Sequence, residues 1–327
     1  MEMEMEMEEK TPFYKQIWFL GGIATIAIFA LCFVALDLVG SPDEDKVPEV
    51  ENEVIATLQT NEPLIKIARE QGWIDADATE LKSVDVVAID SIGTIFSGSD
   101  LQSFTEFRYF LSVQEIHADA FAHSKQLKEI TVPANVSVID YGAFADCPAL
   151  EKMSVDSANT HFDSRDNCNG IICTWKGKLM LVAGCKNTVL SDRVYHIAPH
   201  AFRGCKDLSS IAFPERMESI GDSAFMNCTS LKEVSVPQGV RFIEPGTFIN
   251  CTALQTLNLP KSIERLQKDA FKGCKSLTKI VCPKKFPPII EEAFESYNIT
   301  VYVPEGLENK YFSDKFWKYF KDVKELK

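Results

Sequence analysis

Apolar residues recur over residues 116–304 in one pattern, I-x-x-x-A/T-F-x-x-C-x-x-L-x-x-I-x-V-P. From Ile197 onward the first apolar position returns every 23 residues, and most copies close on a proline. Fixed spacing with fixed apolar columns predicts a solenoid, in which each copy is one coil that buries its apolar face against its neighbours. Six full copies and a truncated seventh begin at Ile116, Ile139, Ile197, Ile220, Ile243, Leu266 and Ile289.

The end of each copy, L-x-x-I-x-V, alternates apolar and polar residues, which predicts a short parallel strand with its apolar residues inward. The A-F-x-x-C segment predicts the return of the coil as a turn or helical turn, with phenylalanine filling each layer beside a small buried cysteine. We therefore expect an α/β solenoid. The residues expected to form its repeated core are Phe121, Phe144, Cys147, Phe202, Cys205, Phe225, Cys228, Phe248, Cys251, Phe271 and Cys274.

One block, residues 157–192, interrupts the repeat between copies over residues 101–156 and 193–303. Within it, ICTWKGKLMLVAG reads as two strands around Lys176 and Gly177, which predicts a β-hairpin. Its tip either presents Trp175 to solvent between lysines or folds Trp175 back over the solenoid, since tryptophan is usually largely buried. The sequence leaves both alternatives open.

The repeat resembles the BspA-type leucine-rich repeat proteins, whose coils carry I-G-x-x-A-F-x-x-C-x-x-L-x-x-I-x-L-P. The resemblance covers roughly residues 101–326, including DSRDNCNGII (163–172) and AGCKNTVLSDRVYHI (183–197) of the insert and VYVPEG (301–306) near the end. It implies a cell-surface or secreted protein of the kind found in bacteria and some parasitic protists, several of which are regarded as adhesins.

That family often places a calcium-binding loop, W-D-x-N-x-D-G-x-L-x-x-x-E, before the repeats. Aligned on Trp73, this chain offers Ile74, Ala76, Ala78 and Thr79 where liganding carboxylates and glycine belong. Calcium needs six to eight oxygen ligands, so we expect no calcium here. The same reasoning assigns the nearby pair of aspartates, Asp75 and Asp77, to a solvated turn.

Residues 17–36 contain no charge and one polar residue, Thr25, so a helix there would reach ~30 Å and could span a bilayer. A cleaved signal peptide would have a basic start and a shorter apolar run, whereas this leader is MEMEMEMEEK. We expect an uncleaved transmembrane helix over residues 17–39, a linker over residues 40–50 and, by the positive-inside rule, a cytoplasmic leader over residues 1–16. Secretion after cleavage is the alternative.

A solenoid needs caps over its terminal apolar layers. Residues 51–100 read as a small helical N-terminal cap. Residues 304–327 predict an amphipathic capping helix, whose aromatic residues recur at three-to-four spacing among lysines. These aromatic residues are Tyr311, Phe312, Phe316, Trp317, Tyr319 and Phe320.

The formal net charge is −13, and residues 102–327 are close to neutral with 28 bases and 27 acids. Nucleic-acid binding needs a concentrated basic surface, so we exclude it. G-x-S-x-G, P-loop and G-x-G-x-x-G motifs are absent from the sequence, and we expect neither catalysis nor a cofactor. His196 and His200 are expected at the surface rather than in a metal site.

The cysteine column reads as buried structural thiols, because zinc sites use closely spaced pairs and these cysteines are 23 residues apart. A disulfide among Cys168, Cys173 and Cys185 of the insert stays open. Sequon asparagines Asn227 and Asn250 occupy one repeat position, which favours a role in turn hydrogen bonding.

The expected function is binding of protein or glycan ligands at the cell surface, through solvent-facing strand residues or the hairpin of the insert, with adhesion implied by the resemblance. A membrane-bound sensor or scaffold within the envelope is the alternative. Ala212 and Val281 complete the outward strand columns but are not expected contacts. The candidate contact residues are Glu129, Thr131, Lys152, Ser154, Trp175, Lys176, Lys178, Ser210, Glu233, Ser235, Thr256, Asn258 and Lys279.

Overall fold

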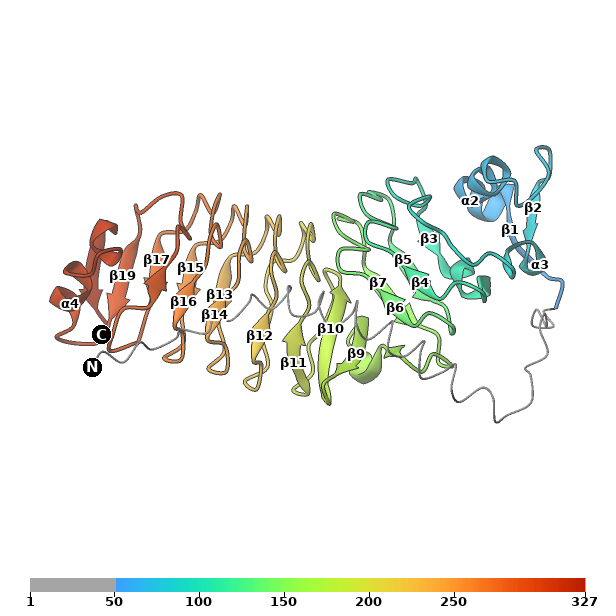
Figure 1. The fold of residues 1–327 in the computed structure, drawn as a ribbon. Coiled ribbons are helices and arrows are strands. Elements are labelled where there is room, and N and C mark those ends of the chain that lie inside the picture. Colours follow the sequence, from blue (N-terminus) through green and yellow to red (C-terminus); the bar gives the residue numbers. More distant parts are fainter. Residues whose placement is uncertain (1–50, 327) are drawn as a thin grey trace, which may run out of the picture. The chain divides into compact units, whose positions relative to one another are not determined.

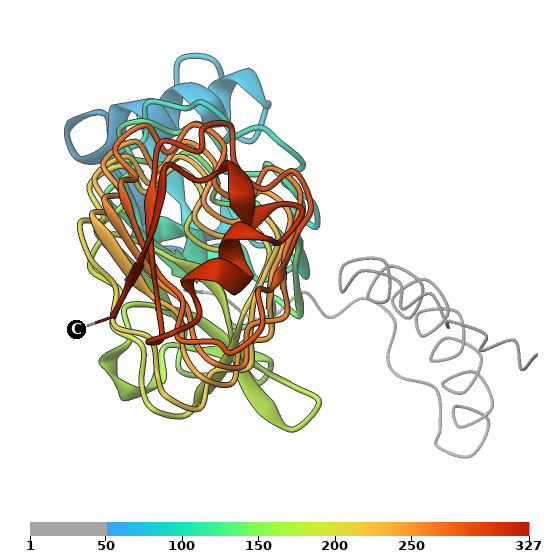
Figure 2. The ribbon, with the colours of Figure 1, turned by 90° about the vertical axis from the view of Figure 1, so that its left-hand side faces the viewer.

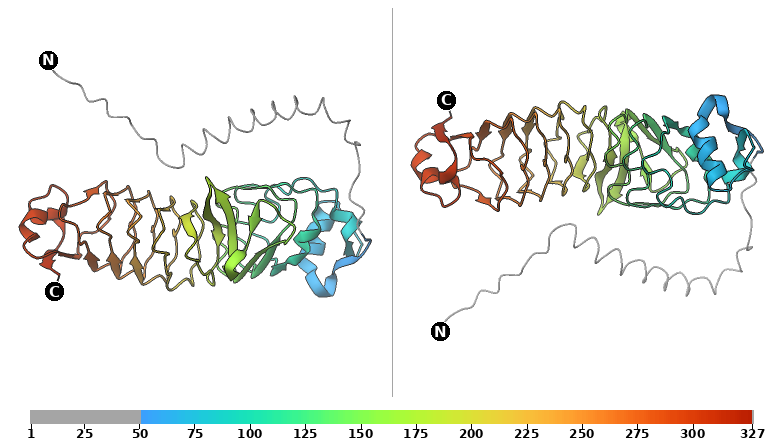
Figure 3. Two further views of the ribbon diagram at one scale, coloured as in Figure 1. Left: turned by 90° about the horizontal axis from the view of Figure 1, so that it is seen from below. Right: turned by 90° about the horizontal axis from the view of Figure 1, so that it is seen from above.

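The computed structural model describes residues 51–326, in which the repeats form a stack of coils (Figures 1 and 3). Strands at the L-x-x-I-x-V segments pair in parallel, so that residues 23 apart lie opposite each other, as Thr256 does to Lys279. The predicted solenoid of short parallel strands is therefore confirmed. These strands form a three-stranded sheet of β3 (Ser103–Phe104), β5 (Glu129–Val132) and β7 (Lys152–Val155), and a five-stranded sheet of β13 (Glu233–Ser235), β15 (Thr256–Asn258), β17 (Lys279–Val281), β19 (Thr300–Val303) and β20 (Asp322–Glu325).

A second column of shorter strands, which the sequence pattern did not lead us to expect, forms where each copy begins. Ile116 lies opposite Ile139, and Ile243 lies opposite Leu266. The A-F-x-x-C segments between the two columns are turns, so of the two predicted alternatives the turn is confirmed and the helical turn is not found in these segments. Their residue before cysteine has a positive φ, 65° at Asn227 and 58° at Asn250, which ends any right-handed helix. The second column comprises β4 (Glu115–Ile116), β6 (Val138–Ile139), β11 (Val194–Ile197), β12 (Ser219–Ile220), β14 (Phe242–Ile243), β16 (Arg265–Leu266) and β18 (Ile289–Ile290).

Phenylalanine rings stack through the coils at regular intervals. Phe225 and Phe248 have centroids 5.4 Å apart with planes 12° apart, and Phe248 and Phe271 follow at 5.5 Å and 9°. Phe248 is completely buried. The rings form two such runs, from Phe96 to Phe144 and from Phe202 to Phe294, which join the coils on each side of the insert by offset aromatic contacts as well as by apolar burial.

Each column cysteine is linked to the coil before it. The thiol of Cys251 donates to the carbonyl of Phe225 at 3.2 Å, and the thiol of Cys147 donates to the carbonyl of Phe121 at 3.0 Å. Ser124 lies at the same repeat position, and its hydroxyl donates to the carbonyl of Phe96 at 2.8 Å. Burial raises the pKa of Cys147 to about 12. The position is thus a small buried donor, which either thiol or hydroxyl can supply.

The coil array begins earlier than residue 101. Phe96 stacks on Phe121 at 5.4 Å with planes 5° apart, and the Gly98 N–H donates to the Ala122 carbonyl at 2.8 Å. An additional coil therefore starts near Ile92. The 23-residue period hides it, because Phe96 and Phe121 are 25 residues apart.

The last copy is out of step by one residue. Leu266 lies opposite Ile290 rather than Ile289, which is 46% exposed. Phe294 still stacks on Phe271 at 5.1 Å. The extra residue lies in the proline-containing connection before the strand, so the expectation that Ile289 points inward is wrong.

The N-terminal cap is only partly helical. β1 (Val54–Thr57) pairs antiparallel with β2 (Glu80–Lys82), and the helices are α2 (Leu58–Glu70) and the short α3 (Ser83–Val86). Thr57 accepts hydrogen bonds from the N–H groups of Gln59 and Thr60 at 3.2 Å, so the chain stays extended until that residue. Asn61 and Trp73 tie the cap to the first coil: Asn61 donates to the Ser103 carbonyl at 3.1 Å, and the Trp73 ring meets Phe110 edge-on at 5.5 Å.

The C-terminal cap is not one amphipathic helix. Only α4 (Glu308–Phe312) and the 3₁₀ turn η4 (Trp317–Tyr319) are helical, and β20 then extends the five-stranded sheet. Asp314 interrupts the helix because its carboxylate accepts from the N–H groups of Phe316 and Trp317. Trp317 is fully buried and donates its indole N–H to the Pro288 carbonyl at 2.7 Å. The aromatic residues therefore cover the last coil through a mixed structure.

The insert forms the expected hairpin of β9 (Gly170–Trp175) and β10 (Lys178–Gly184), and β8 (Phe162–Asp163) pairs with β9. Figure 2, viewed along the stack, shows this part extending beyond the outline of the neighbouring coils. Both turn residues, Lys176 and Gly177, have positive φ, as a two-residue hairpin turn requires. Cys168, Cys173 and Cys185 are free thiols in this structure.

The expected transmembrane helix over residues 17–39, with its leader and linker, lies outside the described residues. Within residues 51–326, no helix has the length and apolar character needed to cross a bilayer.

Candidate binding surfaces

The five-stranded sheet presents two rows of outward side chains, here called the C-terminal sheet face. Inward residues such as Leu257 and Ile280 are fully buried, which fixes the alternate residues on the outer side. Strand register makes each row a continuous line of neighbours. One row is Glu233, Thr256, Lys279, Thr300 and Asp322, and the other is Ser235, Asn258, Val281, Tyr302 and Lys324.

Hydrogen bonds order part of this face. The Asn258 amide donates to Glu233 Oε1 at 2.8 Å and to Ser235 Oγ at 3.0 Å. These contacts cross between adjacent strands and hold the polar side chains at one end of the face.

An aromatic residue completes the face, although the predicted rows contained none. Tyr302 lies opposite Val281, and Lys279 places its Nζ 5.4 Å from the centre of the Tyr302 ring. The alternation of inward Val301 and Val303 could have identified Tyr302 as an outward residue. The prediction omitted it because the outward rows were read from the six full copies, and Tyr302 belongs to the truncated seventh.

The predicted rows do not run through the whole solenoid. Ser210 and Ala212 lie in a coil without a strand at that position, so the sheet is divided. The insert explains the division: Asn169 accepts from the N–H of Met153 at 2.9 Å and donates to the Glu151 carbonyl at 2.7 Å. Those bonds occupy the edge of β7 that a further strand would use.

The smaller sheet brings together the remaining predicted strand residues. Glu129 accepts from Ser103 Oγ at 2.9 Å and pairs with Lys152 at 3.1 Å. The hydrogen bond from Ser103 and the Lys152 charge lower the pKa of the Glu129 carboxyl group. Thr131 and Ser154 share a hydrogen bond of 2.9 Å. These polar groups largely satisfy one another.

The hairpin places its three predicted residues in a mixed environment. Trp175 is half-buried and meets the His196 ring edge-on at 5.1 Å, with Lys176 Nζ 4.4 Å from the tryptophan ring centre. Lys178 pairs with Glu218 at 2.5 Å. Of the two alternatives for Trp175, the structure therefore favours folding back against the solenoid.

The expectation that both histidines lie at the surface is wrong for His196. Pairing of β11 with β10 and β12 places His196 beneath the hairpin, where it is 6% exposed and its Nδ1 lies 2.9 Å from Ser219 Oγ. Burial lowers its pKa. His200 is half-buried, and burial likewise lowers its pKa. Residues 51–326 contain no group of three or more acidic, histidine or cysteine side chains placed to hold a metal ion.

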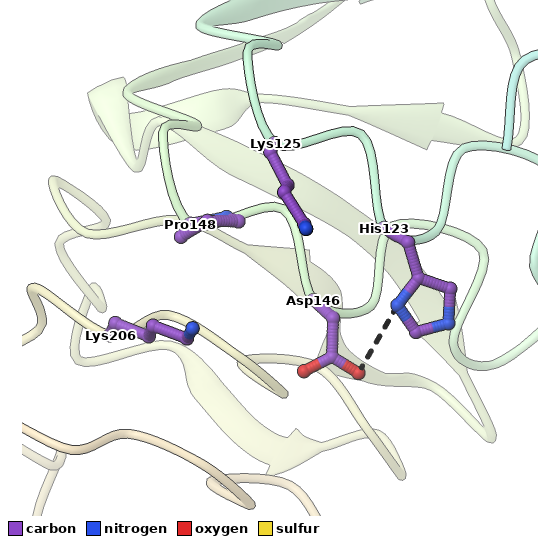
Figure 4. Close-up of a pocket in the computed structure, with 5 residues that line it drawn as sticks. All are labelled: His123, Lys125, Asp146, Pro148 and Lys206. Atoms are coloured by element: carbon purple, nitrogen blue, oxygen red, sulfur yellow. Dashed lines mark ion pairs between the residues drawn. The ribbon is translucent and has the colours of Figure 1, made fainter. Parts of the chain in front are cut away.

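A hollow of about 370 Å³ opens on the turn side of the coils and is here called the turn-edge hollow (Figure 4). It was not predicted, because its residues come from coils on both sides of the insert. Asp146 at its centre pairs with Arg203 at 3.1 Å and lies 3.9 Å from His123. The hollow is lined by His123, Lys125, Asp146, Pro148 and Lys206.

Solved structures provide comparisons for the fold. A leucine rich cell surface protein of Faecalibacterium prausnitzii A2-165 is 21% identical over 66% of this chain and 58% of its own, with a TM-score of 0.48. The pneumococcal vaccine antigen PcpA is 18% identical over 66% of each chain, with a TM-score of 0.50. A leucine-rich repeat protein of Bacteroides ovatus ATCC 8483 is 20% identical over 65% of this chain and 64% of its own, with a TM-score of 0.38.

At these identities the likeness concerns the fold alone. This chain spans less than two thirds of the length of the Faecalibacterium protein. A search of curated proteins by sequence found no match.

The family model for the BspA type leucine rich repeat region matches six copies, over residues 88–169 and 182–301. The match covers more than half of the chain and includes the coil that begins near Ile92. The chain therefore belongs to the BspA type leucine rich repeat family.

Proposed function

We propose that this protein is an exported, membrane-anchored leucine-rich repeat protein that binds protein or glycan ligands at the cell surface and thereby supports adhesion. The observation that carries the proposal is the C-terminal sheet face. Five adjacent strands hold polar side chains in fixed rows beside Tyr302, and aromatic residues commonly anchor protein interfaces. Leucine-rich repeat proteins of this family are generally binding scaffolds, which supports a non-catalytic role.

The anchor in this proposal is residues 17–39, with residues 1–16 in the cytoplasm and the solenoid on the other side of the membrane. The uncharged run over residues 17–36 supports it. Secretion after cleavage would leave the solenoid exported but free. A sensor or scaffold role within the envelope would use the same face for a partner in that compartment.

Protease shaving of intact cells tests the location. Antibodies against residues 100–327 should detect loss of this fragment from intact cells, without permeabilisation. Loss only after the envelope is permeabilised would refute surface exposure and direct the search to envelope partners.

Binding by the C-terminal sheet face is tested separately with the full-length protein on a panel of host proteins and glycans. Replacing Lys279 and Tyr302 by alanine should weaken binding to any hit by ~10-fold or more, because aromatic anchors dominate interface energies. Phe242→Ala, on the second strand column, is the matched control because Phe242 is also partly exposed. Equal effects of the double variant and the control would refute the assignment of this face.

A further inference from the structure

We propose that the turn-edge hollow binds the single carboxylate or sulfate group of an acidic sugar. The site belongs to the A-F-x-x-C turns rather than to the strands, so this inference does not rest on the C-terminal sheet face. It arises from three features of the hollow: its shape, its uncompensated lysines and the confinement of its positive charge.

The shape follows from one column of the repeat. The residue after the column cysteine, or after its serine equivalent, is Lys125, then Pro148, then Lys206 in successive coils. Pro148 and Lys206 are far apart in sequence, yet the Asp146 N–H donates to the Arg203 carbonyl at 2.9 Å, so their coils are neighbours. The short side chain of Pro148 thus lies between the long side chains of Lys125 and Lys206. The hollow is the space that a longer side chain at Pro148 would fill.

Close packing of these coils depends on Gly204. Its φ is +77°, and a Cβ there would overlap the Cα and N atoms of Asp146. The equivalent positions in the next two coils are Asn227 and Asn250, which tolerate positive φ but carry side chains. Glycine therefore permits the two flanking coils to meet where the insert leaves the stack.

The negative charge of the Asp146 carboxylate is already balanced by Arg203. Asp146 Oδ2 accepts from Arg203 Nε at 3.1 Å, and its Oδ1 accepts from the Asn227 amide at 3.3 Å. Neither Lys125 nor Lys206 forms an ion pair with any residue in the range 51–326. In Figure 4 the amino groups of both lysines point toward the space in front of Asp146. The hollow thus offers two uncompensated cations, and a cation would be repelled from it.

The positive charge is confined to this place. In the same column the next two coils carry Thr229 and Thr252, and a lysine returns only at Lys275. A long polyanion needs a continuous basic surface, which this column lacks. The ligand we infer therefore carries one anionic group for the two lysines, and the sugar to which it is attached would lie against Pro148 and His123, which also line the hollow.

The test uses the full-length protein in detergent micelles and isothermal titration calorimetry with three probes. The first probe is sialyllactose, which carries a carboxylate. The second is sulfated lactose, and the third is uncharged lactose. We expect one or both acidic probes to bind at least ~10-fold more tightly than lactose, and the stronger of them identifies the anionic group. Raising the salt concentration should weaken this binding, because exposed charges are screened.

Variants then locate the site. Replacing Lys125 and Lys206 together by alanine should weaken binding of the acidic probe by ~10-fold or more. Lys275→Ala removes a lysine from the same column outside the hollow and should change affinity less than ~2-fold. Pro148→Tyr fills the hollow without changing its charge and should also weaken binding, while thermal melts confirm that each variant is folded.

Three results would overturn the inference. Binding of lactose as tightly as both acidic probes would exclude recognition of the anionic group. An effect of Lys275→Ala as large as that of the double variant would indicate general charge attraction. Unchanged binding by a folded Pro148→Tyr variant would place the sugar elsewhere.

Discussion

The phenylalanine stack makes a quantitative prediction at Phe248. This side chain is completely buried and lies between Phe225 and Phe271, at 5.4 and 5.5 Å. Replacing it by alanine removes the ring from two aromatic pairs and leaves a cavity in a coil that only its neighbours support. We expect the free energy of unfolding of the coils around Phe248 to fall.

The magnitude follows from burial. Phenylalanine-to-alanine changes in cores cost about 3–5 kcal/mol, and aromatic pairs contribute about 0.5–1.5 kcal/mol each. We expect a loss of about 4 kcal/mol for Phe248→Ala and about 2 kcal/mol for Phe248→Leu, which keeps most of the volume but loses both ring pairs. The control is Phe242→Ala in the same coil, at a residue 37% exposed, with an expected loss below about 1 kcal/mol.

The assay is urea unfolding of the full-length protein followed by circular dichroism, with the free energy obtained by linear extrapolation. Hydrogen exchange with mass spectrometry should show lost protection first in the coils next to Phe248, because each coil contacts only its neighbours. Equal losses for Phe248→Ala and Phe242→Ala would refute the view that the ring stack holds the coils together.

Other positions give further tests. Cys251→Ser should leave the free energy of unfolding in urea nearly unchanged, because a hydroxyl serves this position at Ser124. Cys251→Val should cost about 0.5–1.5 kcal/mol, because the Phe225 carbonyl loses the thiol and keeps only the Cys228 N–H as a donor, and equal costs would contradict the thiol's role. Asn227→Val should be less stable than Asn227→Gly by at least about 1 kcal/mol, because both variants lose the amide's hydrogen bond to Asp146 but only valine is strained by a φ of 65°, and similar thermal melts for both would contradict this. Burial raises the pKa of Cys147 to about 12, above its unfolded value of about 8.5, so its contribution to stability is complete below about pH 8.5 and falls by about 1.4 kcal/mol per pH unit as pH rises toward 12. Urea unfolding between pH 8 and 10 should show a shallower decline for Cys147→Ser than for the unchanged protein, and identical slopes would exclude this contribution.

The sequence predicted the solenoid because its physics is local and repeated. Each coil buries the same columns, so the period alone indicates which residues lie inward and which strands pair. The cysteine position could likewise be read as a small buried side chain, since serine replaces it in the first full copy. Where the period changed, prediction failed: Phe96 lies 25 residues before Phe121, and Ile290 replaces Ile289 as the inward residue.

The candidate surfaces were less predictable because they depend on how coils meet. Tyr302 joins the C-terminal sheet face only through the pairing of β19 with β17. The insert divides the predicted rows by hydrogen bonds from Asn169 to the edge of β7, a contact that carries no sequence period.

By itself the sequence determined the repeated fold, the buried columns and the hairpin, because spacing and alternation dictate which groups leave water. Tertiary structure decided the composition of the caps, the burial of His196 and the existence of the turn-edge hollow. Lys125 and Lys206 flank that hollow only because the chain leaves the stack after the coil of Pro148 and the next coil returns beside it. The geometry of such a return depends on packing rather than on local pattern.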